Sequence, residues 1–481
     1  MENPVNRILS KYQSIRAAAA RPARERTMSE KLIISGALNS TSQAISIILR
    51  VVATLVVTRL LSPEIFGLFA IITTFQVILF MLTDFGIPSL IKVSDKTDDP
   101  DFLRTCWTVQ ALRGLFLYVL VLLFALGLYG LQQAGAVSSD TVYGAAVLPA
   151  ALAASGFQLV FQGLSSVNQH VYARDMRFFR ITMMQVIQAF IMPILTILIA
   201  LYHPSVWAFV IAGLGTAASG FVMSFILFPG PSMRFCLNPG YRRELYARGR
   251  WIMSSSAIFV FSSNADQIVL SLFTSPAFLG VYYIAKQIFM VPKGFADNMI
   301  GAVRIQVFKD ILPQGQAEFR QKYYRFRRPV DWFIFVFIGG MLVSGPTLID
   351  LMYDDRYLEA GTILQILAIG LAPICFLVIH GAFEASKRFK LIAFFTFMQF
   401  VTIYATTITV LWIFQEPYYA IFAIALHRVP DTVVMMAMAR REGWLRLRSE
   451  LLNIPAVALG AGAGYAFNTG LQVLGFMQVT G

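Results

Sequence analysis

Apolar runs of about 20 residues follow one another along nearly the whole chain, separated by short polar segments; one run can carry a helix across a hydrocarbon core of roughly 30 Å. Twelve runs have this form: Leu38–Leu61, Phe66–Ile91, Cys106–Tyr129, Val142–Phe161, Ile181–Tyr202, Val206–Phe228, Trp251–Phe273, Leu279–Val303, Val330–Leu351, Ile363–Phe383, Leu391–Phe414 and Tyr418–Ala439. A thirteenth, about Leu452–Val479, is interrupted by Gly460, Gly462, Gly464 and Asn468. The pattern predicts an all-α polytopic membrane protein with twelve core helices and one additional C-terminal helix.

The composition agrees with this pattern. Apolar residues make up 57% of the 481 positions and charged residues 14%, whereas an ordinary globular chain carries about 25% charged residues. Twelve spans of this length leave no room for a sizeable soluble domain.

The net charge of +13 raises the possibility of a nucleic-acid partner, but the distribution of the charge argues against one. The N-terminal arm and every second connection between the runs hold 32 of the 39 Lys and Arg residues. The alternate connections hold almost none beyond Arg356. Basic residues on one side of the membrane mark the cytoplasmic side, so the pattern predicts a cytoplasmic N-terminus. In a bacterium, we expect the protein in the inner membrane. The basic residues follow the topology, so no nucleic-acid partner is expected.

Two smaller features add little chemistry. Residues 1–31 form a basic arm without an apolar core, which does not fit a cleaved signal peptide; the arm could contact anionic lipid or a cytoplasmic partner, or be an inert tail. Cys106, Cys236 and Cys375 lack the spacing of a metal site. We expect no metal, no cofactor and no catalytic residue.

A short motif occurs twice. SPEIFGLFAI begins at Ser62 and SPAFLGVYYI at Ser275, 213 residues later, an offset that equals six spans. Asp84 and Asp297 match at the same offset. Because six is even, the two copies enter the membrane in the same direction, as in transporters built from parallel repeats. The predicted organisation is a cytoplasmic arm (1–31), a six-helix bundle (32–228), a cytoplasmic linker (229–250), a second bundle (251–439) and an interfacial segment with the additional helix (440–481).

The repeated motif fits an external corner rather than a catalytic loop. Proline favours a tight turn or the first turn of a helix, and a preceding serine can cap it. Gly67 and Gly280 come four residues after each proline, where a missing side chain lets two helices approach closely.

Several stretches resemble one family. TRLLSPEIFGLFAI, TDFGIPS, ARDMRFFR and SNADQIVLSLFTSPAFLGVYYIAKQ are similar to segments of bacterial polysaccharide-biosynthesis exporters, members of the multidrug/oligosaccharidyl-lipid/polysaccharide exporter superfamily. The resemblance extends from about Leu32 to Arg440. It implies two six-helix bundles that move an undecaprenyl-pyrophosphate-linked glycan outward by alternating access, for O-antigen, capsule or exopolysaccharide synthesis. A polysaccharide polymerase or chain-length regulator would be a partner.

Ionisable groups inside the predicted spans are candidates for a binding site. A charged side chain at the middle of a membrane helix costs about 2.5–3.5 kcal/mol on insertion scales, so it rarely faces lipid. Arg50 lies midway along the first span, with Ser46 and Thr54 one turn away on the same helical face. Asp266 and Gln267 lie on a polar stripe of the seventh span, which is the matching element of the second half.

Lys286 in the eighth span and Arg428 in the twelfth add two further cations. We expect Arg50, Lys286 and Arg428 to contact an anionic substrate in a cationic cleft, because arginine offers bidentate hydrogen bonds to pyrophosphate oxygens. The alternative is structural: Arg428 could pair with Asp431, and Asp266 could hold one of the cations or bind a coupling ion.

Other polar residues have simpler interpretations. His427 and His380 are expected to pack or hydrogen-bond, Asp84 to cap or hinge a helix, and Arg113 to extend to an interface. The stretches Phe319–Arg328 and Trp444–Arg448 mix aromatic residues with arginine, which is typical of the cytoplasmic membrane interface.

Three other functions are compatible with parts of the sequence. A peptidoglycan-precursor flippase would need much the same site. A multidrug antiporter would need deep carboxylates, of which Asp266 and Asp431 are candidates. A membrane glycosyltransferase or polymerase would need a large external loop, whereas most external connections are only a few residues long. We therefore predict a transporter and no enzyme.

Overall fold

The computed structural model describes residues 46–47, 49–301, 308, 311, 315–446, 450 and 453–473. The basic arm predicted at residues 1–31 lies outside these residues. Helices and turns make up the described parts, and no strand occurs in them. The described helices form two compact units: unit 1 takes its described residues from the chain up to 60, 79–130 and 149–256, and unit 2 from 61–78, 131–148 and the chain from 257 onward. The domain boundaries expected from the sequence stay a prediction.

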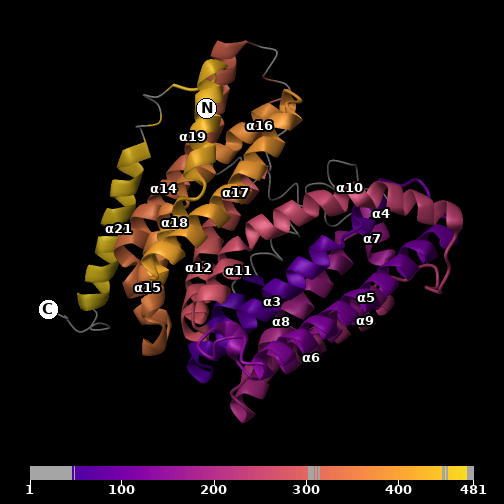
Figure 1. The fold of residues 1–481 in the computed structure, drawn as a ribbon. Helices are drawn as coiled ribbons and strands as arrows, with labels where there is room; N and C mark the ends of the chain where they lie inside the picture. Colours follow the sequence, from indigo (N-terminus) through magenta and orange to yellow (C-terminus); the bar gives the residue numbers. More distant parts are fainter. Residues whose placement is uncertain are drawn as a thin grey trace. The chain divides into compact units, whose positions relative to one another are not determined.

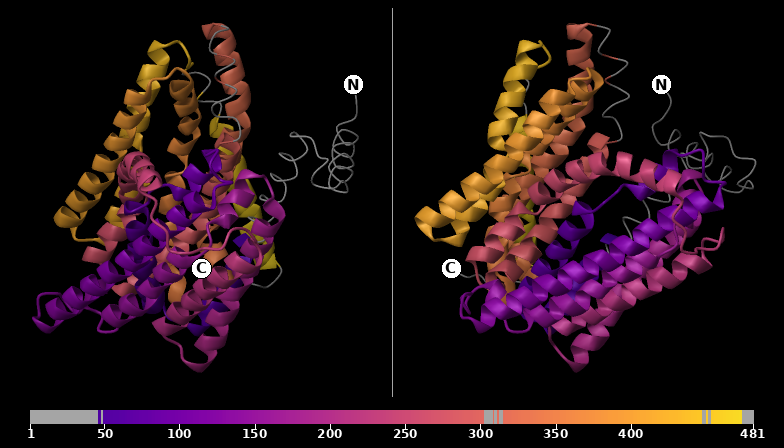
Figure 2. Two further views of the ribbon diagram at one scale, coloured as in Figure 1. Left: turned by 90° about the vertical axis from the view of Figure 1, so that its right-hand side faces the viewer. Right: turned by 45° about the vertical axis from the view of Figure 1, so that its right-hand side comes forward.

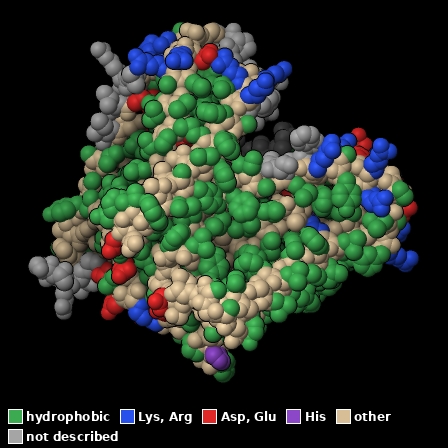
Figure 3. Space-filling view, in the orientation of Figure 1, with side chains coloured by type: hydrophobic (Ala, Val, Ile, Leu, Met, Phe, Trp, Pro, Cys, Tyr) green, Lys and Arg blue, Asp and Glu red, His purple; other side chains and the backbone are tan. Residues whose placement is uncertain are grey.

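The apolar runs form helices long enough to cross a membrane. Eight stretches within the described residues have the necessary length and hydropathy, and two bent helix pairs raise the number to ten. The eight are Pro63–Leu82, Pro100–Gln133, Phe178–Tyr202, Val206–Ile226, Gln316–Met352, Asp355–Ala385, Lys390–Phe414 and Pro417–Arg441. Figure 3 shows hydrophobic side chains along the lengths of the helices and Lys and Arg gathered at helix ends. The protein is therefore a multi-pass helical membrane protein.

Unit 1 is built around one long helix. This helix, α5 (Pro100–Gln133), packs against α6 (Leu148–Leu164) where Gly114 and Gly163 meet, and a Cβ built on Gly114 would lie 2.9 Å from the Cα of Gly163. The helices α8 (Phe178–Tyr202) and α9 (Val206–Ile226) run side by side, as Figures 1 and 2 show.

The predicted second span ends early, at the TDFGIPS stretch. Helix α3 (Pro63–Leu82) is followed by a turn in which the Gly86 N–H donates to Asp84 Oδ1 (2.9 Å), and Gly86 adopts φ 66° before α4 (Ile87–Val93) begins. Arg113 of α5 donates to the Phe80 carbonyl and, at 2.9 Å, to Thr83 Oγ1. Arg113 is therefore buried as a cap of α3. The expectation that it extends to an interface is wrong, because the free carbonyls at the end of α3 offer a closer partner.

Unit 2 is organised around α14 (Gln316–Met352), which lies beside α15 (Glu359–Ile369) and α21 (Ile454–Val473). Glycines bring α21 against α14: a Cβ on Gly460 would lie 2.0 Å from the Val336 carbonyl oxygen, and one on Gly339 would lie 2.1 Å from that of Val457. Gly460 and Gly464 of the thirteenth run therefore serve close helix packing, whereas a Cβ on Gly462 would meet no atom within 4 Å. The remaining helices of the unit are α11 (Ala265–Phe273), α12 (Pro276–Gly301), α16 (Leu377–Ala385), α17 (Phe389–Phe414), α18 (Pro417–Leu426) and α19 (Val429–Arg441).

The two copies of the repeated motif lie against each other within unit 2. A Cβ on Gly67 of α3 would lie 1.9 Å from the Pro276 carbonyl oxygen, and one on Gly280 of α12 would lie 1.8 Å from the Pro63 carbonyl oxygen. The contact is reciprocal, since the glycine of each copy receives the proline carbonyl of the other. This confirms the expectation that Gly67 and Gly280 permit a close helix approach.

Substitution of Gly280 by alanine is expected to destabilise the protein by about 1–3 kcal/mol or more, because the new methyl group would overlap the backbone of Pro63. Gly294 in the same helix has no atom within 4 Å of a Cβ position. Gly294→Ala is therefore a matched control and should stabilise by up to about 1 kcal/mol through helix propensity. Melting temperatures in detergent compare the two variants, and equal effects would contradict the close contact.

Part of the aromatic stretch Phe319–Arg328 is buried inside unit 2. Phe319, Tyr323 and Trp444 are buried in one hydrophobic core, in which the Phe319 and Trp444 ring centroids lie 5.0 Å apart. Arg327 is fully buried among them. The first turns of α14 and the segment after α19 therefore cover part of each other's aromatic faces, while Phe326 stays 38% exposed. The placement of both stretches at the membrane interface stays a prediction.

Candidate functional site

The predicted site residues belong to both units. Asp266, Gln267, Lys286 and Arg428 belong to unit 2, and Ser46, Arg50 and Thr54 to unit 1. The expectation that all of them face one substrate stays a prediction. Each group is described below within its own unit.

In unit 1, Arg50 lies on the helical stretch 49–60, and its side chain is exposed. Among the described residues no side chain bonds to its guanidinium, whereas Thr54 Oγ1 donates to the Arg50 carbonyl (2.7 Å). Val52 and Val56 on the same stretch are also exposed. Arg50 thus carries a positive charge without a partner in this part of the structure.

In unit 2, Lys286 is paired. Its Nζ lies 2.6 Å from Asp266 Oδ2, and both side chains are largely buried. The hydroxyl of Tyr282, one turn before Lys286 on α12, donates to the same oxygen at 2.5 Å. Asp266 therefore forms an ion pair with Lys286, which is one of the two alternatives expected from the sequence. Its second carboxylate oxygen, Oδ1, is buried and has no hydrogen-bond partner among the described residues.

Gln267, next to Asp266, connects α11 to α3. Thr74 Oγ1 donates to Gln267 Oε1 at 2.6 Å, and both side chains are buried. One turn further along α11, Ser271 Oγ lies 3.2 Å from the Tyr143 hydroxyl. The polar stripe of the seventh span is therefore directed inside unit 2, where each group finds a partner on another element.

A helix break places these residues. Helix α10 (Pro239–Ser263) ends before Asn264, α11 begins at Ala265, and the stretch Ser256–Ser263 is bent by 51° relative to α11. The Asn264 side chain donates to the Val260 carbonyl (3.0 Å). Asp266 follows the break, in the first turn of α11. Interrupted helices of this kind form binding sites in many transporters, because the break leaves backbone polar groups free inside the membrane.

A second break carries the cation predicted at Arg428. Helix α18 ends at Leu426 and α19 begins at Val429, with Pro430 in its first turn. Arg428 Nη2 donates to Gln399 Oε1 (3.2 Å). Arg428 and Asp431 attract each other electrostatically, but no ion pair within 4.0 Å joins them in the described part of unit 2.

The histidine beside Arg428 fits its structural interpretation. His427 Nδ1 lies 2.5 Å from the Ile424 carbonyl oxygen, and Nε2 lies 3.5 Å from Gln399 Nε2. His380 packs on Phe395 with ring centroids 5.7 Å apart. Both histidines make packing or hydrogen-bonding contacts, as predicted.

Sequence reasoning missed four members of this site. Tyr282 could have been found, since it precedes Lys286 by four residues and shares its helical face. Thr74, Gln399 and Tyr143 come from other helices. No spacing rule connects them with their partners, so only the tertiary structure brings them into the site.

The site residues bring several kinds of polar group together inside unit 2. They offer an ammonium group held by one carboxylate, an amide, several hydroxyl groups and a half-buried guanidinium, all within apolar helices. No group of three His, Cys, Asp or Glu side chains suitable for a metal occurs among the residues described. Fold and site together define a multi-pass membrane protein with buried polar and charged side chains inside unit 2.

Comparisons with known proteins agree on the family and the fold. The polysaccharide biosynthesis protein family matches residues 56–362. The solved structure of the lipid II flippase MurJ in its inward closed conformation has a TM-score of 0.66 and 13% identity, and covers 91% of this chain and 100% of its own. An inward-facing multidrug resistance transporter of the MATE family, in the MOP superfamily, has a TM-score of 0.57 and 13% identity, with 83% of this chain and 94% of its own covered. No curated protein sequence matches.

The chain belongs to the polysaccharide biosynthesis protein family, because the family match covers more than half of it. Its fold is similar to those of MurJ and of the MATE family transporter. The resemblance seen in the sequence is thereby confirmed.

Proposed function

We propose that the protein flips an undecaprenyl-pyrophosphate-linked oligosaccharide from the cytoplasmic to the periplasmic leaflet of a bacterial inner membrane, for O-antigen, capsule or exopolysaccharide synthesis. The family match supports a role in polysaccharide biosynthesis. The observation that carries the proposal is the pairing of Lys286 with Asp266 at a helix break inside unit 2. A buried cation beside hydroxyl and amide groups suits the pyrophosphate and first sugar of such a lipid.

Lys286 is neutralised by Asp266 in the conformation described, so substrate binding must compete with that carboxylate. A pyrophosphate carries more negative charge than one carboxylate and can displace it electrostatically. Arg50 would supply a second cation from unit 1, and alternating access would expose the substrate first to one side and then to the other. Outward movement of negative charge from a negative interior gains about 2.3 kcal/mol per charge per 100 mV.

A second candidate substrate is a peptidoglycan precursor. The observation in its favour is the structural similarity to a lipid II flippase over the whole length of that chain. The two candidates share an undecaprenyl pyrophosphate and differ in the sugar. Multidrug antiport has less support, because the Asp266 carboxylate, which would have to bind a cationic drug, is already occupied by Lys286.

Movement of lipid between the leaflets of proteoliposomes tests the proposal. The full chain is reconstituted with a fluorescent undecaprenyl-pyrophosphate-linked oligosaccharide or with lipid II, and movement between leaflets is followed by the accessibility of the label to an impermeant quencher. We expect the oligosaccharide lipid to move faster than in protein-free vesicles. Movement of lipid II alone would favour the second candidate. Movement of neither lipid, with a cationic dye transported instead, would overturn the proposal.

A further inference from the structure

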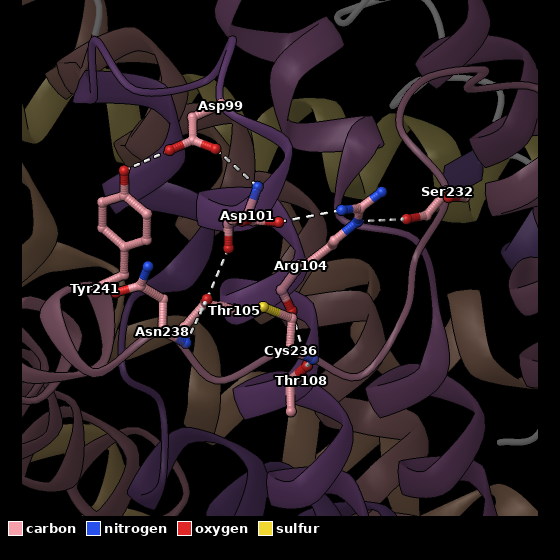
Figure 4. Close-up of polar contacts among 9 residues, drawn as sticks. All are labelled: Asp99, Asp101, Arg104, Thr105, Thr108, Ser232, Cys236, Asn238 and Tyr241. Carbon is pink, nitrogen blue, oxygen red and sulfur yellow. Dashed lines mark hydrogen bonds and ion pairs between the residues drawn. The ribbon is translucent and has the colours of Figure 1, made fainter.

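The chain between α9 and α10, residues 227–238 (the strap), has no helix or strand but is fastened to unit 1 by side chains. Arg104 Nε donates to the Ser232 carbonyl (3.2 Å). The Cys236 N–H donates to Thr108 Oγ1 (3.0 Å), as Figure 4 shows. The Asn238 N–H donates to Thr105 Oγ1 (3.3 Å). Hydrogen bonds along the first turns of α5 therefore fix the path of the strap.

This fixed path leaves apolar side chains exposed. Phe235 is 70% exposed and Leu237 is 45% exposed. The Phe235 ring packs against Trp107 in a tilted arrangement with centroids 5.1 Å apart, so it is held in place. Tyr246 on the following turns of α10 is 53% exposed. Aromatic side chains displayed near a helix end are typical of the membrane–water interface, where lipid covers the ring.

Basic side chains without partners adjoin these apolar ones. Arg234 lies in the strap, and Arg242 and Arg243 lie in the first turns of α10; all three are exposed. None of the three side chains makes a hydrogen bond or ion pair to another residue in the described part of unit 1. Figure 3 shows Lys and Arg gathered at this end of the unit, around α4 and α10.

Three of the acidic side chains nearby are engaged elsewhere, whereas Asp98 is exposed. Asp99 accepts a hydrogen bond from the Tyr241 hydroxyl, which lowers the pKa of Asp99 and keeps it charged. Asp101 pairs with Arg104 (3.1 Å). Glu244 pairs with Lys96 (2.8 Å). The surface presented outward by the strap and α10 therefore has a net positive charge.

We propose that this surface binds anionic phospholipid. Arg234, Arg242 and Arg243 would contact the phosphate headgroups, while Phe235 and Leu237 enter the boundary of the acyl chains. An amphipathic surface with arginine beside aromatic and aliphatic side chains has the chemistry of an anionic membrane surface. The site is separate from the proposed transport site, and the lipid is a bound partner rather than cargo.

Lipid binding to the purified full chain in neutral detergent tests this. Dihexanoyl phosphatidylglycerol, which is anionic, and dihexanoyl phosphatidylcholine, which is zwitterionic, are titrated separately, and bound lipid is counted by native mass spectrometry. Each arginine near a membrane surface contributes about a fivefold change in affinity. We therefore expect Arg242→Gln with Arg243→Gln to weaken phosphatidylglycerol binding by about 25-fold, and Phe235→Ser to weaken binding of both lipids.

Arg440 and Arg441 at the end of α19 provide a matched control. Both are exposed arginines in unit 2, and the double substitution to glutamine removes the same charge. This control variant should bind phosphatidylglycerol as the unmodified chain does. An equal loss in both double variants would show a general effect of net charge and overturn the site, as would equal affinity of the unmodified chain for the two lipids.

Discussion

Transport is expected to fall by about 10- to 100-fold when Lys286 is replaced by glutamine, because a hydrogen bond to a charged group contributes about 1.5–3 kcal/mol. The single substitution also leaves Asp266 buried without its cation, which can destabilise the protein. The double variant Lys286→Gln with Asp266→Asn removes both charges together. It should keep normal abundance and melting temperature and still fail to transport.

Lys293 and Asp297 serve as the matched control, since they form an ion pair of 2.9 Å on the same helix and are more exposed. The double variant Lys293→Gln with Asp297→Asn should transport at the native rate. If the Lys286 and Asp266 double variant transports equally well, the cation is structural and the proposed site is wrong.

Arg50 offers an independent comparison within the same transport assay. Its exposed guanidinium has no partner among the described residues, so Arg50→Gln should impair transport without lowering the melting temperature. Arg50→Lys should retain partial activity, because lysine keeps the charge and loses the bidentate geometry. A native rate for Arg50→Gln would remove Arg50 from the site.

Replacement of Arg327 by alanine is expected to destabilise the protein by about 3–5 kcal/mol, the usual cost of removing one partner of a buried ion pair. Arg327 is fully buried; its Nε lies 3.0 Å from Asp331 Oδ1 and its Nη2 lies 2.7 Å from Glu450 Oε2. Asn453 donates to the second oxygen of Asp331 (3.0 Å). Loss of Arg327 would leave two carboxylates unpaired and loosen the segment that leads into α21.

Denaturation in detergent and limited proteolysis near Glu450 measure the effect. Lys322→Ala is the control, since Lys322 forms a partly exposed pair with Glu318 on the same helix (2.8 Å) and should contribute less than about 1 kcal/mol. Equal stability of the two variants, with no new cleavage in the C-terminal segment, would show that the buried cluster does not fasten α21.

Features that depend on neighbours in the sequence could be predicted. Apolar runs, alternating basic connections and the repeated proline–glycine corner all follow from local composition. The apolar runs indicate a helical membrane protein, and the structure confirms this. The apolar run around Lys286 also predicts that Lys286 lies within a membrane helix. The spacing of four residues predicts that Tyr282 lies on the same helical face.

The partners of those residues were decided by the tertiary structure. Asp266 meets Lys286 only because α11 and α12 pack together beyond a helix break, and Thr74 reaches Gln267 from a helix 193 residues away in sequence. The partners of Arg327 could not be predicted either. An aromatic and basic stretch can lie at a membrane surface or pack against another part of the protein with a similar gain in free energy. Local sequence determines which helical faces must be buried. It does not determine the partner, because one apolar or charged side chain looks like another in a local pattern. The partner is selected by the free energy of packing the whole chain.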